Sequence, residues 1–477
     1  MKFSFPVKIY LLALVLRLIP VFLTMNMGIG LDDMFQYDML ARNLASGHGF
    51  RWYALEDLKR LEPYVSLDLS TASDYDPRYG VYTSFRAPLY PTFLAFIYSL
   101  SGLGFSRFFA ARCAQAILLG APLAPLTYGI AKRFFVDIDS NEKISRLAAS
   151  IVACYPMLLV YPLGLGTENL FFILLLFSFL FLLRTLAAPS KLNFLFAGVF
   201  LGLAALTRSV VLPFVGVSLF YLFYLHRTKV WITFVAFCLI ISPWMIRNSL
   251  LHHKLTGIET SMGYNLYLGY YPEGNGSFIF GPSLDLLPIM DDSERDAIGT
   301  EKALEFIRAE PGRFIPLALN RLGFFFGLEN RVLMYFYSNN LLGYISTPIL
   351  LLISAFFLLP FVFVSILAVF GLVAQKPSQP RALLHLLLFA YIMPYVLILS
   401  EDRFHLALIP FLAMLASYTF VLLKERRYVH YVSIRTLALA GILIILLMLN
   451  WGLELHRDAD KIAAILQPNG NQLYLPY

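Results

Sequence analysis

The sequence has few charged residues and few cysteines. Only 14% of its 477 residues are charged, whereas 59% are hydrophobic and 16% are aromatic. A chain with so little charge is too apolar for a soluble globule, and its shortage of polar residues excludes intrinsic disorder. The three cysteines, Cys113, Cys154 and Cys238, all lie inside apolar runs. That placement argues against a disulfide framework and against a cysteine metal site.

Several other patterns are missing from the sequence. No repeat with a period of about 20–50 residues stands out, and the apolar runs do not alternate as the strands of a β-barrel would. There is no glycine-rich loop of the kind that cradles a nucleotide phosphate, since the turn GLGTEN is too short to be one. His48, His252 and His253 lack metal-site spacing, so we expect neither a metal nor another cofactor.

The sequence does contain a series of long apolar runs. Roughly 20 apolar residues are needed to cross a membrane as a helix, so the runs predict an all-α polytopic membrane protein. The first run follows Lys2 and Lys8 but has no small-residue cleavage site, and we interpret it as a span rather than a signal peptide. We assign about eleven spans, near residues 9–27, 108–131, 147–163, 169–186, 192–206, 209–225, 230–246, 344–373, 382–399, 404–423 and 433–451.

The positive charges set the orientation of these spans. The net charge of +7 favours an inside-positive membrane topology over binding to nucleic acid. With the N-terminus inside, each short cytoplasmic loop is basic, and together these loops hold Lys132, Arg133, Lys143, Arg146, Arg184, Lys191, Arg227, Lys229, Lys376, Arg381, Lys424, Arg426 and Arg427. Counting the short, proline-containing segment 87–105 as a crossing would invert the later loops. We therefore interpret that segment as an outer-face juxtamembrane or re-entrant helix.

Two large outer loops follow from this topology, residues 28–107 and 247–343. The second contains DDSERDAIGTEKALEFIRAEP, in which Ser293 and Asp296 predict a capping box and Pro311-Gly312 a stop, so we expect a helix there. The tail, 452–477, is also outside and is too short to form an independent domain.

Most of the notable ionisable residues near span ends collect on the predicted outer face. They are Asp32, Asp33, Arg86, Glu168, Arg208, Arg247, Glu401, Asp402 and Arg403. Each residue also has an explanation that needs no functional site: an arginine at a span end extends to the lipid headgroups, adjacent acids cap a helix, and a short turn is solvated. Their convergence on one face favours a site. Carboxylates accept a proton from an attacking hydroxyl and arginines hold a phosphate, which suits transfer of a group from a lipid phosphate.

Six segments in order resemble the GT-C superfamily of polyprenyl-phosphate-sugar glycosyltransferases, which includes protein O-mannosyltransferases and aminoarabinose lipid A transferases. The segments are GIGLDDMFQYDMLARNLASGHGF (28–50), RAPLYPTFLAFIYSLSG (86–102), GTENLFFILLLFSFLFLL (166–183), GLAALTRSVVLPF (202–214), PWMIRNSLLHHKLTGIETSMGYNLYLGYYPEGNG (243–276) and DRFHLALIPFLAML (402–415). The likeness implies a GT-C-like bundle with outer-face juxtamembrane helices. It also implies a catalytic module at 1–246 that includes the loop 28–107, a large helical outer loop at 247–343, and further spans at 344–451.

The resemblance also implies roles for particular residues. The catalytic aspartate falls on the Asp32-Asp33 pair: alignment on the pair selects Asp32, and alignment on Tyr37 selects Asp33. The other roles fall on Glu168 for orienting a substrate, on Arg86, Arg208 and Arg403 for the donor phosphate, and on Asn265 and Tyr267 for the sugar or acceptor. The implied partners are a polyprenyl-phosphate sugar, membrane lipids and a lipid, glycan or protein acceptor. Because the motifs look bacterial, we expect the inner membrane with a periplasmic active site.

Two other functions compete with this hypothesis. A secondary transporter or lipid flippase usually binds its substrate near the membrane midplane, and Arg17 is the residue whose position in the sequence is mid-span. A polysaccharide polymerase or ligase that uses a lipid-diphosphate donor shares much of the expected architecture. The lipid that copurifies, monophosphate or diphosphate, separates that alternative from ours.

Overall fold

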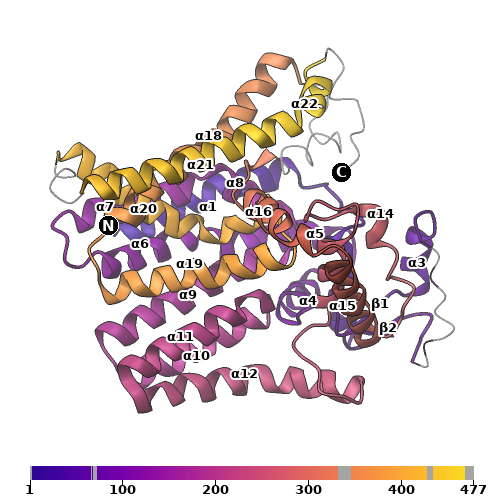
Figure 1. Ribbon diagram of the computed structural model, residues 1–477. Coiled ribbons are helices and arrows are strands. Elements are labelled where there is room, and N and C mark those ends of the chain that lie inside the picture. The colour runs from indigo at the N-terminus through magenta and orange to yellow at the C-terminus, as the bar shows by residue number, and fades with distance from the viewer. Residues whose placement is uncertain are drawn as a thin grey trace.

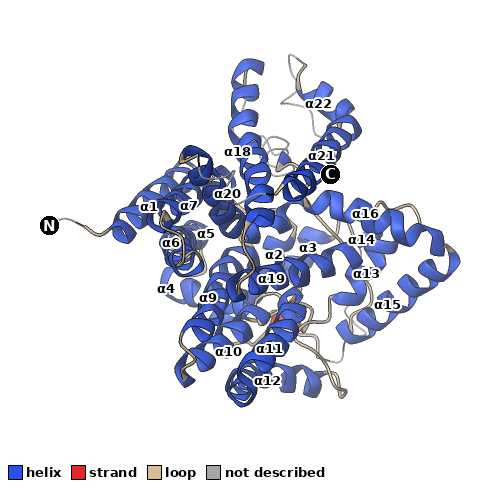
Figure 2. Ribbon diagram, turned by 60° about the vertical axis from the view of Figure 1, so that its left-hand side comes forward, coloured by secondary structure: helices blue, strands red, loops and turns tan. Residues whose placement is uncertain are grey.

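The computed structural model is almost entirely helical, and it describes residues 3–65, 67, 72, 74–330, 345–426 and 433–467. Within these residues the named strands are β1 (Arg51–Trp52) and β2 (Val81–Tyr82), which pair antiparallel. Figure 2 shows how little of the chain is strand. The prediction of an all-α polytopic membrane protein is confirmed.

The long apolar helices run side by side through the molecule (Figure 1). Among the described residues eight helical segments are long and apolar enough to cross a membrane, or nine if the pair α7 and α8–η3, bent by 54°, is one span. One of the eight contains both α11 and α12, and the shorter apolar helix α10 lies between α9 and α12. Every predicted span falls on one of these helices: α1 (Phe5–Leu23), α5 (Ser106–Ala114) with η2 (Gln115–Gly120) and α6 (Leu123–Phe134), α7 (Asn141–Cys154) with α8 (Pro156–Val160) and η3 (Tyr161–Leu163), α9 (Thr167–Ala187), α10 (Lys191–Ala205), η4 (Ser209–Val211) with α11 (Leu212–His226), η5 (Arg227–Lys229) with α12 (Val230–Leu251), α18 (Thr347–Ala374), α19 (Gln379–Leu397), η7 (Asp402–Leu408) with α20 (Ile409–Lys424), and α21 (Ile434–Arg457).

The two large loops fold into shorter helices that gather at one end of the bundle (Figure 1). They are α2 (Asp33–Ala45), α3 (Leu55–Leu61) and α4 (Leu89–Ser101) in the first loop, and α13 (Met262–Tyr270), α14 (Phe280–Ser283), α15 (Asp292–Ala309), η6 (Pro311–Arg313) and α16 (Phe314–Phe325) in the second; α22 (Ala459–Ile465) follows α21. Arg427, residues 331–343 of the second loop and residues 468–477 of the tail lie outside the described residues.

Contacts between loops agree with the charge-based topology. Lys143 Nζ lies 2.7 Å from Glu425 Oε1, which joins the start of α7 to the end of α20. Lys229 Nζ donates to the carbonyl of Pro189 at 2.9 Å, which joins two further predicted cytoplasmic loops. The predicted outer turns meet one another at the opposite end, as described below. Loops assigned to the same side therefore lie together.

The segment 87–105 forms helix α4, as expected for a juxtamembrane element. Its 13 residues are too few to cross a bilayer. Figure 1 shows α4 nearly end-on, whereas the long helices run across the view. It packs against α2 at the end of the bundle. The first loop thus presents both helices on the same side as the converging ionisable groups.

The helix predicted in the second loop is α15, but its cap differs from the prediction. Asp291 is the N-cap, because its carboxylate accepts from Ser293 N at 2.7 Å and Glu294 N at 3.0 Å. The predicted capping box of Ser293 and Asp296 is wrong, since Ser293 already lies in the first turn and the Asp296 carboxylate accepts from Gly263 N at 2.6 Å. Asp296 instead ties α15 to α13.

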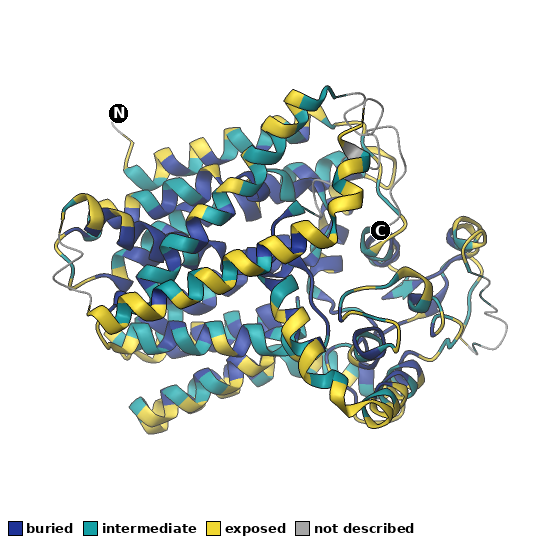
Figure 3. Ribbon diagram, turned by 45° about the horizontal axis from the view of Figure 1, so that its top comes forward, coloured by how far each residue is buried: buried dark blue, intermediate teal, exposed yellow. Residues whose placement is uncertain are grey.

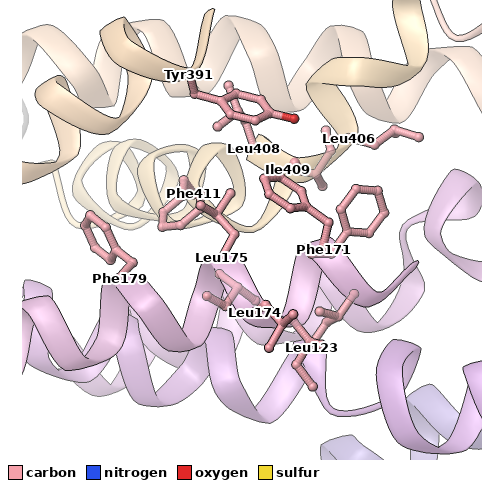
Figure 4. Packing of buried hydrophobic residues seen from close by; sticks show 14 of the residues in the cluster. Leu123, Phe171, Leu174, Leu175, Phe179, Tyr391, Leu406, Leu408, Ile409 and Phe411 are labelled. Atoms are coloured by element: carbon pink, nitrogen blue, oxygen red, sulfur yellow. The ribbon is translucent and has the colours of Figure 1, made fainter. Parts of the chain in front are cut away.

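The centre of the bundle is formed by α9 and α20, the most buried of the spans. Phe179 packs edge-on against Phe411 with ring centroids 4.9 Å apart, and Phe171 stacks on Tyr391 at 5.9 Å. Figure 4 shows these rings, with Tyr391 contributed by α19, beside Leu174 and Leu175 of α9 and Leu406 and Leu408 of η7. Exposed residues line the outer helices (Figure 3), where apolar side chains would face lipid.

Two glycines explain how α10 packs closely against α12. Gly198 and Gly202 are four residues apart and therefore lie on one helix face. A Cβ at Gly198 would lie 2.3 Å from the carbonyl oxygen of Thr233, and one at Gly202 would lie 2.7 Å from Ile240 Cβ. Small residues at this spacing allow two membrane helices to approach closely.

Arg17, the arginine placed mid-span by the sequence, has a structural role. It is fully buried, and its guanidinium donates to the carbonyls of Val152 at 3.1 Å and Ala153 at 3.2 Å. These carbonyls lie in the last turn of α7, where Pro156 begins the next helix and prevents α7 from continuing. Arg17 therefore satisfies carbonyls that the break leaves without helical partners.

Candidate active site

The two adjacent acids at the start of α2 have different environments. Asp32 is the N-cap of α2: it has an extended backbone and its Oδ1 accepts from Met34 N at 2.9 Å. Asp33 is the first helical residue, and its carboxylate contacts Arg86 through Oδ1 and Arg403 Nη2 through Oδ2 at 3.4 Å. Helix geometry thus assigns the cap to Asp32 and directs Asp33 toward the arginines.

Arg86 joins the first helix of the loop to the start of α4. Besides the contact with Asp33, its Nε and Nη2 donate to Gln36 Oε1 at 2.8 and 2.6 Å. Its guanidinium also lies 5.4 Å from the centre of the Tyr37 ring and 5.1 Å from that of Phe85. Gln36 and Tyr37 lie in the first turns of α2, so one arginine fixes the orientation of the helix that carries Asp33.

Glu168 and Arg208 form the most buried ion pair of the cluster. Glu168 lies in the first turn of α9, and its Oε1 is 2.5 Å from Arg208 Nη1. The same nitrogen donates to Thr167 Oγ1 at 3.2 Å. Asn169 holds the preceding turn by donating to the carbonyl of Gly164 at 3.0 Å. The predicted second and third outer turns therefore meet.

Arg403 links the last of the predicted outer turns to the first. Its Nε lies 2.8 Å from Glu401 Oε2, and its Nη2 reaches Asp33. The Arg403 side chain is 35% exposed, compared with 20% for Arg86 and 18% for Arg208. Arg403 is therefore the most accessible of the three arginines, and its contact with Asp33 is the longest.

The arginines determine the protonation of Asp33. Burial alone would raise the pKa of its carboxyl, but the charges of Arg86, Arg403 and Arg208 outweigh that effect and lower the pKa to about 2. Burial and the neighbouring Asp33 charge instead raise the pKa of Asp32 above its usual value. Asp33 is thus the acid held ionised at neutral pH, and its side chain remains 38% exposed and open to a substrate.

A second network holds α2 from its other side. Asp38 is buried and accepts from Arg42 Nε at 2.9 Å, from Arg107 Nε at 2.8 Å and from the Tyr98 hydroxyl at 3.0 Å. These partners lie on α2, α5 and α4, and Arg42 also pairs with Asp57. Asp38 therefore fixes α2 against the juxtamembrane helix without contacting the arginines of the cluster.

The segment that precedes Arg86 is anchored by a Ser–His–Asp arrangement. Ser84 Oγ lies 2.7 Å from His252 Nε2, and His252 Nδ1 lies 3.4 Å from Asp291 Oδ1. The order resembles a hydrolase triad, but Ser84 is fully buried and its hydroxyl also contacts Thr260 Oγ1 at 3.0 Å. A substrate cannot reach a buried hydroxyl that already makes two hydrogen bonds. These contacts attach the first loop to the second.

Not all predicted site residues join the cluster. Tyr267 is directed elsewhere: its hydroxyl donates to Asp285 Oδ2 at 2.7 Å and its ring packs against Phe306. Asn265 is half-buried on α13 beside it. Arg247 donates to the backbone carbonyl of Thr83 and holds the first loop. The structure brings together Asp33, Arg86, Glu168, Arg208 and Arg403, with Asp32 adjacent to them.

Sequence reasoning missed Gln36 and Glu259, and it named Glu401 without assigning it a partner. Gln36 binds Arg86, and Glu401 pairs with Arg403. Glu259 accepts from Ser209 N at 3.3 Å and, with Asp33, raises the pKa of Arg86, whose burial acts in the opposite direction. Glu401 was visible as part of the turn SEDRFH, whereas a single acid in a long loop gives no spacing signal that would have identified Glu259.

We expect substitutions of Asp32 to separate its capping role from the chemistry. Asp32→Asn keeps an acceptor for Met34 N, so activity should remain within about threefold of the wild type. Asp32→Ala removes that acceptor and should cost about 1 kcal/mol of stability. Thermal denaturation in detergent, compared with activity at a temperature where both variants are folded, measures the two effects. A larger loss of activity in Asp32→Asn than in Asp33→Asn would reverse the assignment.

Comparison with known proteins finds matches among solved structures and none among sequence families. No protein-family model and no curated protein matches the chain. Among solved structures, the Archaeoglobus fulgidus oligosaccharyltransferase in complex with Zn and sulfate matches with a TM-score of 0.47 and 16% identity over 99% of this chain. ArnT from Cupriavidus metallidurans matches with TM-scores of 0.39 bound to undecaprenyl phosphate and 0.37 in the apo state, at 13% and 14% identity, over 87% of this chain.

The chain differs in length from these proteins. It spans 57% of the oligosaccharyltransferase chain, and 77% and 76% of the two ArnT chains.

Proposed function

We propose that this chain is a membrane glycosyltransferase that transfers a sugar from a polyprenyl-phosphate donor to an acceptor hydroxyl, with inversion, on the outer (periplasmic) face of a bacterial inner membrane. The observation that carries the proposal is the convergence of Arg86, Arg208 and Arg403 with Asp33 and Glu168 at one end of an apolar helix bundle. Ionisable groups at such a position are costly and mark functional sites.

Three arginines suit the charge change in this reaction. The donor is a phosphodiester with one negative charge, and the bond between the anomeric carbon and the phosphate oxygen breaks with its electron pair leaving on oxygen. The departing polyprenyl phosphate therefore gains a second negative charge. Guanidinium groups fixed around that oxygen stabilise the transition state more than the ground state, which is what accelerates the reaction.

Asp33 would act as the base. It would take the proton of the acceptor hydroxyl while the acceptor oxygen attacks the anomeric carbon from the side opposite the phosphate, which gives inversion. Asp33 remains ionised because arginines surround it, and it is exposed enough for an acceptor to reach it. Glu168 is paired with Arg208, which suits a role in orienting a substrate or that arginine.

Binding of the donor would also activate the base. A carboxylate with a pKa of about 2 is a weak base. Arg403 makes the longer of the two arginine contacts with Asp33 and is more exposed than Arg86 and Arg208, so a donor phosphate competes best for Arg403. Once the phosphate takes Arg403, Asp33 loses one of its compensating charges and becomes more basic.

This arrangement predicts a particular dependence of activity on pH. Protonation of Asp33 removes the base, so activity is lost only as pH falls toward about 2, and kcat/KM for the donor should show no acid limb from Asp33 between about pH 5 and 8. The acid limb of kcat should lie at higher pH than that of kcat/KM, because the bound phosphate engages Arg403. Initial rates in buffers of constant ionic strength test this. An acid limb of kcat/KM in the neutral range that disappears in Asp32→Asn would contradict it.

The structure also bears on the transporter alternative. Arg17 is bound to backbone carbonyls of a broken helix and is fully buried, so it does not present a charge to a midplane substrate.

The direct test of the proposed function is reconstitution of the purified protein in liposomes with a polyprenyl-phosphate sugar and candidate acceptors, followed by NMR assignment of the product anomer. Flux of the lipid without any covalent product would favour a flippase. Activity restricted to lipid-diphosphate donors would favour a polymerase or ligase.

A further inference from the structure

A buried polar cluster lies behind the turn that carries Arg403. His405, on η7, is fully buried, and its Nε2 lies 3.1 Å from Glu329 Oε1. The hydroxyl of Tyr155 donates to the same oxygen at 2.5 Å. Glu329 follows α16 and Tyr155 lies between α7 and α8, so three distant parts of the chain meet here. Neither the resemblance nor the proposed reaction assigns a role to these side chains.

The contacts of His405 define where its protons lie. Nδ1 is 2.8 Å from the carbonyl oxygen of Phe325, which can only accept, so Nδ1 carries a proton. Nε2 and Glu329 Oε1 then share one further proton. Glu329 Oε2 is buried without a hydrogen-bond partner among the described residues, and burial raises the pKa of Glu329. His405 and Glu329 are therefore joined by a buried hydrogen bond of fixed geometry.

The cluster fixes the backbone next to Arg403. His405 is two residues after Arg403 on the same short helix, and its ring stacks on Phe361 of α18 with centroids 4.1 Å apart. The ring is therefore held by α16, α18 and the break after α7. Arg403 itself is partly exposed and reaches Asp33 through a single long contact. Its position depends mainly on where η7 lies.

We propose that His405 and Glu329 are positioning residues that lock η7 and thereby hold the Arg403 guanidinium between Glu401 and Asp33. The role of Arg403 toward a donor phosphate rests on the proposed function, whereas the locking of η7 does not. Tyr155 supports the lock by orienting Glu329. Neither His405 nor Glu329 touches the substrates, so they act on the reaction only through Arg403.

The experiment measures the chemical reactivity of Arg403 directly. Purified full-length protein is treated with phenylglyoxal, and modification of Arg403 is followed by mass spectrometry with the exposed Arg308 of α15 as an internal reference. The variants are His405→Gln, Glu329→Leu and Glu329→Gln. The matched control is His385→Gln, because the hydrogen bond of His385 within the described residues goes to the backbone of its own helix, from Nδ1 to the Arg381 carbonyl at 2.7 Å.

We expect His405→Gln and Glu329→Leu to raise the modification rate of Arg403 about fivefold, since freeing η7 lets the side chain leave its partners. The KM for the donor should rise about tenfold with a smaller change in kcat. Glu329→Gln should be close to wild type, because an amide nitrogen at the position of Oε1 can donate one hydrogen to neutral Nε2 and the other to the Tyr155 hydroxyl oxygen. The control should leave Arg403 reactivity unchanged.

The failure of this proposal is distinguishable from failure of the proposed function. Unchanged Arg403 reactivity in folded His405→Gln and Glu329→Leu would overturn the positioning role whatever the transfer activity. If those variants do not fold, Tyr155→Phe, which removes one hydroxyl, should shift Arg403 reactivity in the same direction, and no shift would overturn the role. Farnesyl phosphate should protect wild-type Arg403 from phenylglyoxal. Absence of protection would overturn the phosphate-binding role and leave the lock standing.

Discussion

Replacing Asp33 with asparagine is expected to lower kcat about a thousandfold or more, because general-base catalysis contributes about 10²–10⁴ and the amide cannot accept a proton. The fold should survive, since the asparagine oxygen still accepts from Arg86 and the helix cap belongs to Asp32. Transfer from a polyprenyl-phosphate sugar, measured as initial rate at saturating donor, tests this prediction.

Asp32→Asn is the matched control for Asp33→Asn, because the two positions are adjacent, carry the same side chain and lie at the same helix terminus. The asparagine at position 32 keeps the cap and removes only a carboxylate. A full loss at position 33 with little change at position 32 would assign the base. Full activity in both variants and in the double variant would end the glycosyl-transfer hypothesis as stated.

The sequence predicted the spans well because hydropathy and loop charge are local properties of the chain. The short segment 87–105 was predicted not to cross the membrane for the same reason, and its helix α4 has too few residues for a crossing. The N-cap of α15 was predicted wrongly. Asp291 and Ser293 both have capping side chains, and only the backbone conformation before the helix decides between them.

The sequence predicted that the ionisable residues of the candidate site lie together, but it did not predict which of them form ion pairs. Topology places Asp33, Glu168, Arg208 and Arg403 at one end of the bundle, but which carboxylate meets which arginine depends on contacts between residues distant in the sequence, 370 positions apart for Asp33 and Arg403. The choice between Asp32 and Asp33 required the N-cap geometry. Tyr267 pairs with Asp285, 18 residues later in the same loop, and no pattern in that loop indicates this.

The second large effect is expected at Arg208. Its partner Glu168 has a side chain only 9% exposed, so Arg208→Met leaves a buried carboxylate without its cation. Removing one partner of a buried pair costs about 3–5 kcal/mol, and losing one fixed donor at a developing negative charge costs about 10²–10³ in kcat. Thermal denaturation in detergent and initial rates of transfer measure the two losses separately.

The double variant Arg208→Met/Glu168→Leu distinguishes the structural role of the pair from its chemical role. Replacing both charges with apolar side chains of similar size removes the stranded carboxylate, so stability should return close to that of the wild type. Activity should stay at least about a hundredfold reduced, because the phosphate still lacks its guanidinium. Arg208→Lys should restore stability more than rate, since an ammonium lacks the planar fork that binds a carboxylate and a phosphate in two places. Recovery of activity in the stable double variant would mean that Arg208 serves the fold alone and that Arg86 and Arg403 hold the donor.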